Sequence, residues 1–389
     1  MPEISRKIFI SAGESSGDIH GANLMHCLLE KNPNITFYGL GRENMLQAGL
    51  HGLHDMSGKS LMWLQVLTEL SGFMKMKKDC IHFLRQERPC AVILIDYCGF
   101  NFHLAKAAKK LGIPVIYYIS PQLWAHAPWR ARKMKKLVDK LLVIYPFEKS
   151  FYNNAGIPVT YVGHPLFDEI HKEGADEGLV TELKNQMGET IASFLPGSRR
   201  QEIVRLLPLF LQSAVQIHQT IPSAQFVISC SNEQNFDLIS AITKESPVPC
   251  KIVVGSVHEV IKASTLCIAG AGTITLQIAY YLKPMIIAYK ISPIVYFIAR
   301  PFLITPYIGL VNKLASKMIV PERLMCRGNY AWLANQAIQL LNNPQKRQAC
   351  IHELSLLMDE IAKPGASEHA ADEILTLLSS KPNDPRSFL

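Results

Sequence analysis

The sequence of 389 residues has no apolar run that approaches the roughly 20 residues needed to cross a bilayer, so we expect no transmembrane helix. The apolar residues 8–10 give way to the polar, glycine-rich segment 11–18, and no signal peptide is readable there. The nine cysteines include no Cys-x-x-Cys pair and no cysteine–histidine cluster with metal-ligand spacing. We therefore expect a cytosolic protein with reduced cysteines and no structural metal.

An Asp-x-Asp pair is also missing, so a metal that bridges a diphosphate is not indicated. Hydrophobic residues make up 48% of the chain and charged residues 19%, which is typical of a globular protein. The net charge of +8 suits nucleic acid, an anionic membrane or a phosphorylated small molecule. The basic clusters carry no interleaved aromatics of a recognisable nucleic-acid module, so we expect no nucleic-acid partner.

Near-continuous apolar runs alternate with amphipathic helical stretches, a pattern typical of a parallel sheet covered on both faces. In the first half the predicted strands are residues 7–11, 36–40, 91–96, 114–119, 140–145 and 160–162, with helices such as 21–30 and 101–111 between them. In the second half they are residues 191–195, 225–229, 251–254, 266–269 and 285–289. The sequence therefore predicts an α/β protein with two Rossmann-like, doubly wound domains.

The expected boundaries follow from a charged, weakly periodic linker at residues 164–185. Residues 1–165 would form the first domain, and residues 186–345 the second. Residues 346–389 would be helices and a tail, packed either on the N-terminal domain or on a partner subunit. Two such domains place ligands at the carboxyl ends of their strands, facing each other across a cleft, as in GT-B glycosyltransferases.

The first loop that could take part in binding or catalysis, residues 11–18, follows a strand and opens a helix. Ser15, Ser16 or Asp18 would cap that helix, and His20 follows them. The loop lacks both the Gly-x-Gly-x-x-Gly fingerprint and a following Gly-Lys-Ser/Thr, which argues against a Rossmann dinucleotide site and a Walker loop. A well-capped strand-to-helix turn remains the alternative interpretation.

Two further loops follow strands in the first half. Asp96 ends an apolar strand, where a carboxylate is costly unless it faces a cleft or is well paired. Asn101 would cap the next helix, and Ser120 and Trp124 follow the next strand. The alternatives are that Asp96 merely closes its strand and that Trp124 is a packed aromatic. The basic residues after Trp129 would face phosphate or lipid.

The second half has two loops suited to an anion. At the first, a strand ends, a turn contains Ser198, and a helix begins with Arg199 at its mouth. The positive end of a helix and a planar guanidinium both attract phosphate. At the second, Gly272 and Thr273 open a helix on which Gln277 shares the face of Thr273. Together they predict a nucleotide diphosphate site, against the alternatives of an exposed first turn and tight helix–sheet packing.

These loops, with other motifs, resemble in order the lipid A disaccharide synthase family of Gram-negative bacteria from about residue 7 to residue 325. The motifs are Ala-Gly-Glu-Ser-Ser-Gly-Asp-Ile-His-Gly-Ala (12–22), Ile-Asp (95–96) with Phe-Asn (100–101), Tyr-Ile-Ser-Pro (118–121) with Trp-Ala (124–125), Pro-Phe-Glu-Lys (146–149) with Phe-Tyr (151–152), Val-Gly-His-Pro (162–165), Leu-Pro-Gly-Ser-Arg (195–199), Gly-Thr (272–273), Tyr-Lys (289–290) with Ser-Pro (292–293), Pro-Tyr-Ile (306–308) and Val-Pro-Glu (320–322). Each motif is unspecific alone, whereas the ordered set is specific.

The resemblance implies an inverting GT-B glycosyltransferase without cofactor or metal. In such an enzyme, residues 1–165 would form an acceptor-binding, membrane-facing domain, and residues 186–345 a domain that binds a UDP donor. The enzyme would join UDP-2,3-diacylglucosamine to 2,3-diacylglucosamine 1-phosphate (lipid X), and release a β-1,6-linked disaccharide 1-phosphate and UDP. It would work as a peripheral protein on the anionic cytoplasmic face of the inner membrane, and a homodimer is left open. Asp96 matches the family aspartate and would act as the base, with His20 as the weaker alternative. Arg199 matches the family arginine, and Asn312 matches an asparagine that lines the UDP pocket.

Some positions depart from the family pattern. The usual glutamate on the Gly-Thr helix is Gln277, whose amide can still accept a bond from a ribose hydroxyl. The usual Leu-Pro-Asn is Leu-Val-Asn at 310–312, and Glu-Leu-Leu-Gln is Glu-Arg-Leu-Met at 322–325. Gly-Gly-Pro-x-Met is reduced to Gly-Leu-Gly at 39–41 with Met45. Two other hypotheses therefore stay open: another GT-B UDP-sugar enzyme, such as an epimerase or a muramyl-type transferase, and a non-catalytic lipid- or nucleotide-binding paralogue.

Residues 61–78 have the pattern of a helix that lies in a membrane interface, where an apolar face enters the lipid boundary and lysines meet anionic headgroups. The residues predicted to contact lipid are Trp63, Val66, Leu67, Leu70, Lys75, Lys77 and Lys78. The alternative is an ordinary amphipathic core helix, because the opposite face is weakly charged.

Overall fold

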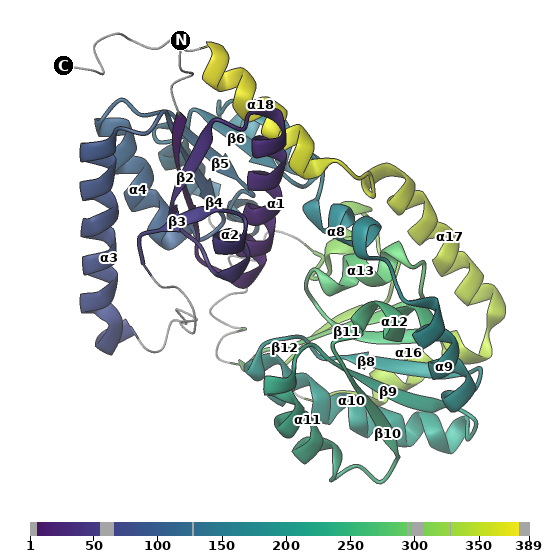
Figure 1. Cartoon of the computed structure of the whole chain (residues 1–389). Helices are drawn as coiled ribbons and strands as arrows, with labels where there is room; N and C mark the ends of the chain where they lie inside the picture. The colour runs from purple at the N-terminus through teal and green to yellow at the C-terminus, as the bar shows by residue number, and fades with distance from the viewer. Residues whose placement is uncertain are drawn as a thin grey trace. The chain divides into compact units, whose positions relative to one another are not determined.

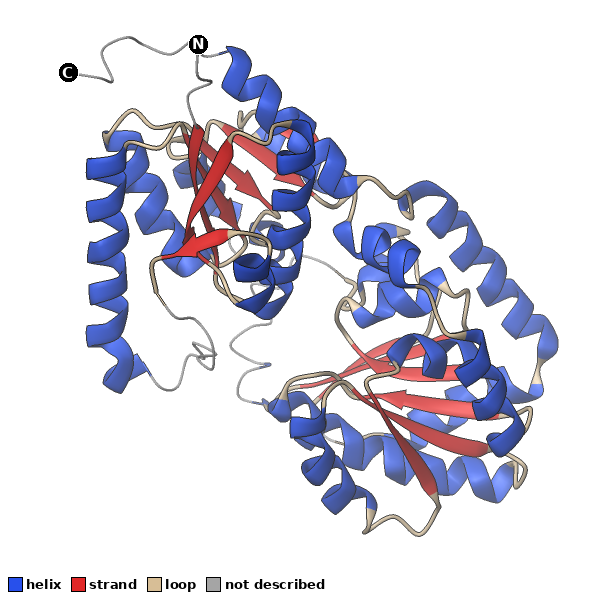
Figure 2. Cartoon of the chain, viewed as in Figure 1, coloured by secondary structure: helices blue, strands red, loops and turns tan. Residues whose placement is uncertain are grey.

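The computed structural model describes residues 6–54, 66–126, 128–293, 296, 306–326 and 328–380. The chain divides into two compact units: unit 1 comprises Met1–Asp168 and Lys363–Leu389, and unit 2 comprises Glu169–Ala362. Each unit is built on one parallel sheet with helices packed around it (Figures 1 and 2). The predicted α/β class with two doubly wound sheets is confirmed.

The sheet of unit 1 has the strand order β3-β2-β1-β4-β5-β6-β7. Its strands are β1 (Arg6–Ala12), β2 (Ile35–Leu40), β3 (Leu50–Gly52), β4 (Ala91–Ile95), β5 (Val115–Tyr118), β6 (Lys140–Val143) and β7 (Val159–Tyr161). Its helices are α1 (Ser15–Lys31), α2 (Glu43–Gln47), α3 (Val66–Glu87), α4 (Cys98–Lys110), α5 (Leu123–His126), η1 (Pro128–Arg130), α6 (Ala131–Lys135), α7 (Pro146–Asn154) and α18 (Ala366–Ser380). From β1 the chain moves outward to β3, and from β4 it moves outward the other way. The topological switch point, where such sheets bind ligands, therefore lies between β1 and β4.

Apolar burial holds unit 1 together. All five residues of β4 are fully buried, as expected for a central parallel strand. Phe100, Leu104 and Ala108 recur every four residues along α4 and join the same buried cluster. Each large side chain removed from water in this way contributes roughly 1.5–3 kcal/mol. The carboxyl ends of the central strands are thus fixed on a rigid frame.

The C-terminal helix α18 packs against α1 in unit 1 (Figure 1). Its first turn is capped by Asp168, whose carboxylate accepts hydrogen bonds from the backbone N–H groups of Gly365, Ala366 and Ser367. Lys31 of α1 forms an ion pair with Asp372 at 2.8 Å. The boundary between the units falls within helix α8 (Pro165–Glu173), and α9 (Glu177–Met187) follows it.

The sheet of unit 2 has the order β10-β9-β8-β11-β12-β13, so its switch point lies between β8 and β11. Its strands are β8 (Ile191–Leu195), β9 (Gln225–Cys230), β10 (Cys250–Val254), β11 (Leu266–Gly270), β12 (Met285–Lys290) and β13 (Glu322–Met325). Its remaining helices are α10 (Arg200–Thr220), η2 (Glu233–Asn235), α11 (Phe236–Thr243), α12 (Val257–Ala263), α13 (Ile274–Tyr280), α15 (Leu310–Leu314), α16 (Tyr330–Asn342) and α17 (Pro344–Ile361).

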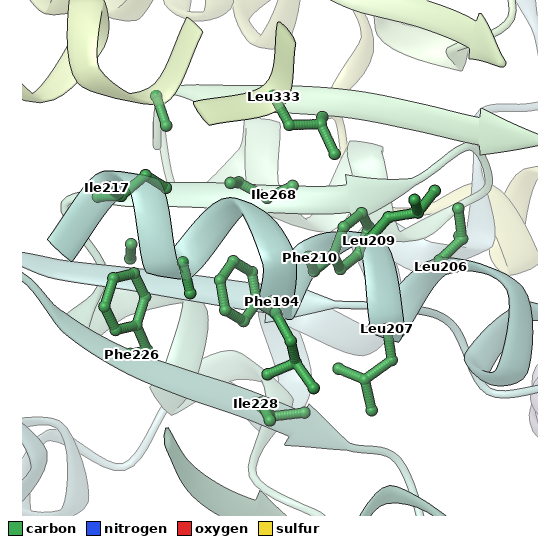
Figure 3. Packing of buried hydrophobic residues seen from close by; sticks show 14 of the residues in the cluster. Phe194, Leu206, Leu207, Leu209, Phe210, Ile217, Phe226, Ile228, Ile268 and Leu333 are labelled. Atoms are coloured by element: carbon green, nitrogen blue, oxygen red, sulfur yellow. The ribbon is translucent and has the colours of Figure 1, made fainter. Parts of the chain in front are cut away.

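The core of unit 2 lies where α10 packs on the sheet, as Figure 3 shows. Leu206, Phe210 and Ile217 of α10 belong to one buried cluster with Phe194 of β8 and Phe226 of β9. The rings of Phe194 and Phe226 stack with their centroids 5.7 Å apart. This packing anchors the N-terminal end of α10 beside the end of β8.

All eleven predicted strands are present, with ends shifted by at most two residues. The apolar pattern of the sequence did not predict β3 and β13. Two of the three residues of β3 are exposed, and β13 contains Glu322 and Arg323, so neither segment has the apolar run of a buried strand. Among the described residues, no helix is both long and apolar enough to cross a membrane.

Candidate functional site

In unit 1 the polar loops gather at one edge of the sheet. Strands β1, β4, β5 and β6 are parallel neighbours, so the loops that follow them emerge side by side at their carboxyl ends. These loops and the helix starts that follow them contain most of the unit 1 side chains that the sequence singled out: Ser15, Ser16, Asp96, Asn101, Ser120 and Trp124. The topology therefore places them at the switch point and along the same edge.

Asp96 follows β4 in an unusual backbone conformation. Its φ is +42° and that of Tyr97 is +43°, in the left-handed region that non-glycine residues seldom adopt. The carbonyl of Asp96 accepts hydrogen bonds from the hydroxyl of Tyr117 and from Nδ2 of Asn101, the latter at 3.0 Å. The side chain itself is half-buried. The fold thus holds a carboxylate at the sheet edge in a conformation that the surrounding bonds must maintain.

Asn101 supplies much of that support. Its side chain is completely buried, and its Oδ1 accepts a bond from Oγ of Ser11 at 2.8 Å. Its Nδ2 donates to the carbonyl oxygens of Ile95, at 3.1 Å, and Asp96. The amide therefore ties the ends of β1 and β4 together. Because its polar atoms are used within the protein, we infer that Asn101 positions the Asp96 turn.

The ring of Tyr97 closes over the start of the first loop. A Cβ atom on Gly13 would lie 2.4 Å from two atoms of this ring, so only glycine fits at position 13. Ser15 and Ser16 are exposed in the first turn of α1, and Ser15 Oγ accepts a bond from Nη1 of Arg42 at 2.9 Å. The expectation that Ser15, Ser16 or Asp18 caps α1 is not met, since the N-cap is Glu14 and no side chain caps it.

Asp18 binds backbone groups at the start of helix α2 instead of capping α1. It is buried inside α1, and its carboxylate accepts bonds from the backbone N–H groups of Arg42, Asn44 and Met45 at the start of α2. These bonds satisfy N–H groups that the first turn of a helix cannot pair itself. Asp18 therefore fixes the loop that leads from β2 into α2.

His20 is half-buried on α1 and lies near His164, which is buried in the turn after β7. Burial, with a smaller contribution from His20, lowers the pKa of His164 to about 3. Nδ1 of His164 accepts a bond from the N–H of Leu166 at 3.2 Å. His164 is therefore neutral at physiological pH.

Glu148 belongs to this edge, although it was not among the predicted site residues. It is fully buried in the first turn of α7, and its Oε1 accepts bonds from Ser120 Oγ at 2.7 Å and Trp124 Nε1 at 2.9 Å. Burial raises the pKa of Glu148 to about 7, against the opposing effect of these bonds. The only sequence signal was its place in the motif Pro-Phe-Glu-Lys (146–149), where it is indistinguishable from a first-turn capping acid.

In unit 2 the loops after β8 and β11 meet at the switch point. A Cβ atom on Gly270 would lie 3.6 Å from the carbonyl oxygen of Pro196, so the two loops run close together. Gly197 has φ +108°, and a Cβ there would lie 2.2 Å from the carboxylate of Glu202. The turn into α10 thus requires glycine at position 197.

Arg199 is the N-cap residue of α10, and its guanidinium is exposed, 3.7 Å from the carboxylate of Glu202. Ser198 is exposed, and its carbonyl oxygen accepts a bond from Nδ2 of Asn235 at 2.8 Å. Thr273 is exposed at the start of α13, where Gln277 is half-buried one turn later. The structure therefore brings two helix starts and an exposed arginine to one edge, an arrangement suited to an anion.

Asn312, which is predicted to line the UDP pocket, has only protein partners in its hydrogen bonds. It is completely buried, its Oδ1 accepts bonds from the N–H groups of Ile319 and Val320, and its Nδ2 donates to Val320 O and Glu322 Oε2. Glu322 also accepts bonds from the backbone of Ile308 and Gly309. The amide is fully engaged, so we infer a role for Asn312 in holding the Pro-Tyr-Ile loop.

The predicted lipid contacts lie on or near α3. Trp63 lies outside the described residues; Val66, Leu67 and Leu70 are helical, but the structure describes nothing of their side chains. Lys75 and Lys78 are exposed, and Lys77 is half-buried. Within the described part of the chain, no group of three or more histidine, cysteine or acidic side chains could hold a metal ion.

Comparison with known proteins gives one family. The family model described as "LpxB: Lipid-A-disaccharide synthetase" matches residues 8–374. A protein from Syntrophus aciditrophicus named "Lipid-A-disaccharide synthase" is 36% identical over 376 residues, which cover 96% of this chain and 98% of that protein. A "Lipid-A-disaccharide synthase 1" from Legionella pneumophila is 35% identical over 383 residues, which cover 98% of this chain and all of that protein.

Solved structures show the same fold at low sequence identity. MnaA of S. aureus in complex with UDP has a TM-score of 0.68 at 12% identity, over 98% of this chain and 99% of that chain. This likeness shows the fold alone, which is of the predicted GT-B type.

Proposed function

The chain belongs to the lipid-A-disaccharide synthetase family of glycosyltransferases, and we propose that it transfers 2,3-diacylglucosamine from UDP-2,3-diacylglucosamine to the 6-hydroxyl of 2,3-diacylglucosamine 1-phosphate. The observation that carries the proposal is the family match over residues 8–374, which includes the loops at both switch points. The products would be the β-1,6-linked disaccharide 1-phosphate and UDP.

In this reaction the acceptor hydroxyl loses a proton as its oxygen attacks the anomeric carbon of the donor. The bond between that carbon and the β-phosphate oxygen breaks on the opposite side, which inverts the configuration and releases UDP. A carboxylate within hydrogen-bond reach of the hydroxyl can accept the proton. Asp96 is our candidate because it combines partial exposure with a backbone fixed by Asn101 and Tyr117 at the switch point.

UDP leaves with negative charge that develops on its β-phosphate, and fixed positive groups stabilise that charge. The proposed donor site is the pair of adjoining loops in unit 2, with Arg199, the backbone near Ser198 and that of Gly272 and Thr273. Its support is the exposed guanidinium beside the start of the 21-residue helix α10. Gln277 would reach the ribose hydroxyls. We retain no direct nucleotide contact for Asn312, because its amide is engaged within the protein.

Because both substrates carry acyl chains, we also propose that α3 contacts anionic lipid of the inner membrane. Met74, Lys75 and Lys78 are exposed on it. The basic surface extends beyond α3: burial, and then nearby Lys77, Lys133 and Lys106, lower the pKa of His103 on α4. Lysines from three helices therefore surround one position of unit 1, and each basic residue near an anionic bilayer contributes about 1 kcal/mol.

The condensation itself is the experiment that tests the function. Purified protein receives UDP-2,3-diacylglucosamine, radiolabelled lipid X, or both, and UDP and labelled disaccharide are measured. We expect both products only when both sugars are present. A protein that binds UDP but releases none from UDP-2,3-diacylglucosamine would favour a non-catalytic paralogue. Conversion of a UDP-sugar without any acceptor would favour an epimerase.

Membrane contact is tested by sedimentation with vesicles that contain anionic phospholipid. The double variant Lys75→Glu/Lys78→Glu replaces two positive charges of α3 with two negative ones, and Lys184→Glu/Lys244→Glu makes the same change at exposed positions of unit 2. We expect only the α3 variant to lose vesicle binding at low salt. Equal loss in both variants, or a wild-type protein that stays in the supernatant, would contradict the membrane proposal.

A further inference from the structure

Glu148 connects two neighbouring loops at the acceptor edge of unit 1. As the third residue of α7 it accepts a bond from the N–H of Tyr145 through Oε2, at 3.1 Å, which completes the usual cap of that helix. Its Oε1 reaches across to the loop after β5 and accepts bonds from Ser120 and Trp124. A cap requires only the first of these contacts, so the other two bonds indicate a second role.

The loop that Glu148 holds follows a residue with a strained backbone conformation. Ile119, which precedes it, has φ +60°, a conformation that a β-branched residue strongly disfavours. A second anchor also comes from α7, since the hydroxyl of Tyr152 donates to the carbonyl of Pro121 at 2.7 Å. The loop 120–124 is therefore fastened to α7 at its start and at Trp124. This loop lies next to the Asp96 turn, because β4 and β5 are neighbours in the sheet.

The hydrogen-bond chemistry distinguishes the two protonation states of Glu148. The indole N–H of Trp124 and the backbone N–H of Tyr145 can only donate, so both require an acceptor oxygen. An ionised carboxylate satisfies them together with the Ser120 hydroxyl. Protonation turns one carboxylate oxygen into a hydroxyl, which is a weaker acceptor and carries a hydrogen that needs a partner of its own, so at least one of the three contacts weakens. The three contacts therefore fit the ionised form, whereas complete burial opposes it.

The titratable groups around Glu148 come from several elements. Tyr145 precedes α7, Tyr152 lies two turns along α7, and the ring of His164 lies 5.3 Å from that of Tyr145. Burial raises the pKa of both phenols and lowers that of His164, so all three are neutral near pH 7. Among the described residues, the charged groups that act on Tyr145 are Glu148 and Asp96, and both raise its pKa.

We propose that Glu148 is a proton-sensitive positioning residue, whose ionised carboxylate holds the Ser120–Trp124 loop in the conformation that receives the acceptor sugar. The role in acceptor binding rests on the proposed function. The carboxylate clamp itself rests only on the contacts described above and can be tested without substrate.

The first experiment follows the tryptophan fluorescence of the substrate-free protein from pH 5 to 9. The pKa of about 7 predicts a transition near pH 7, as the partner of the Trp124 indole gains or loses its charge. We expect Glu148→Gln and Trp124→Phe each to abolish the transition, and Glu173→Gln, at an exposed glutamate, to leave it intact. Ser120→Ala removes one bond to the carboxylate and should move the midpoint to higher pH, which tests the clamp even if Glu148→Gln does not fold. A wild-type protein without any such transition overturns the inference.

The second experiment measures the condensation at each pH. In the wild type we expect the KM for lipid X to rise several-fold as the pH falls through 7, while UDP affinity stays constant. Glu148→Gln should keep the high KM at every pH. A variant that melts at a lower temperature but keeps the wild-type pH profile would show that Glu148 is only structural. A wild type that shows the fluorescence transition but no condensation would contradict the proposed function and still support the clamp.

Discussion

The carboxyl edges of the two sheets differ in how far their polar side chains are buried and hydrogen-bonded. At the edge of unit 1, Ser11, Asn101, Ser120 and Glu148 are all buried and hydrogen-bonded to protein partners. At the edge of unit 2, Ser198, Arg199 and Thr273 are exposed around glycine turns and helix starts. A locked network suits a reaction in which one proton must leave at one position. An exposed guanidinium and backbone suit an anion that binds and departs.

The largest expected effect comes from breaking the unit 1 edge at Asp96. In Asp96→Asn the amide keeps the shape of the side chain but cannot accept the proton of the acceptor hydroxyl. We expect kcat to fall by about 10²–10⁴-fold, with an unchanged melting temperature. Asp359→Asn, at an exposed position of α17, should keep wild-type turnover. Near-normal turnover of folded Asp96→Asn would rule out the assignment.

The pH dependence of the free energy of unfolding tests the buried network at the edge of unit 1. The pKa of Glu148 is about 7 when folded and near the ordinary 4.5 when unfolded, so the folded state binds the extra proton between these values. The free energy of unfolding therefore falls as the pH rises through this window, by an amount on the order of 3 kcal/mol, and the loss is complete above the folded pKa.

Urea unfolding of wild type and Glu148→Gln at pH 5 and pH 8 measures this difference. The variant cannot titrate, so we expect the wild type to lose stability relative to it between the two values. His164, whose lowered pKa of about 3 makes stability rise with pH up to about 6.5, is present in both proteins and cancels. A constant difference between the two proteins would mean that the carboxyl does not titrate in this range.

The corresponding test at the edge of unit 2 removes the exposed guanidinium of Arg199. Arg199→Ala should weaken UDP binding by about 1.5–3 kcal/mol, the contribution of a charged hydrogen bond. The matched control is Arg200→Ala, an exposed arginine one residue later on α10. If calorimetry finds equal losses of UDP affinity in both variants, the effect comes from the general positive charge of this region and not from a specific contact of Arg199.

The smallest expected effect concerns Gln277. The resemblance to the family places glutamate at this position, and a carboxylate accepts bonds from two ribose hydroxyls more strongly than an amide does. Gln277→Glu should therefore tighten UDP binding by about 0.5–1.5 kcal/mol. Weaker UDP binding in this variant would indicate that Gln277 does not face the ribose.

Local sequence patterns predicted the sheets well, because buried parallel strands such as β4 and β8 are continuous apolar runs. The edge strands β3 and β13 lack that signal. The return of α18 onto α1 depends on contacts between residues more than 300 positions apart, such as Lys31 with Asp372, which no local pattern contains.

Among the site residues, the sequence identified the loops but not the state of each side chain. Asn101, Asn312 and Asp18 look like ligands or caps in sequence, and the structure shows each of them engaged with backbone groups. Glu148 looks like a surface cap, and only the packing of α7 on the loop after β5 reveals its burial. Burial and partner choice arise from tertiary packing, which spacing along the chain does not encode.

The most direct test of the account measures UDP affinity and turnover together in Asp96→Asn and Arg199→Ala. We expect Asp96→Asn to bind UDP as the wild type does and to form almost no disaccharide. Arg199→Ala should bind UDP weakly and recover part of its turnover at high donor concentration. Loss of UDP binding in Asp96→Asn, or wild-type UDP binding in Arg199→Ala, would contradict the division of donor binding and proton transfer between the two units.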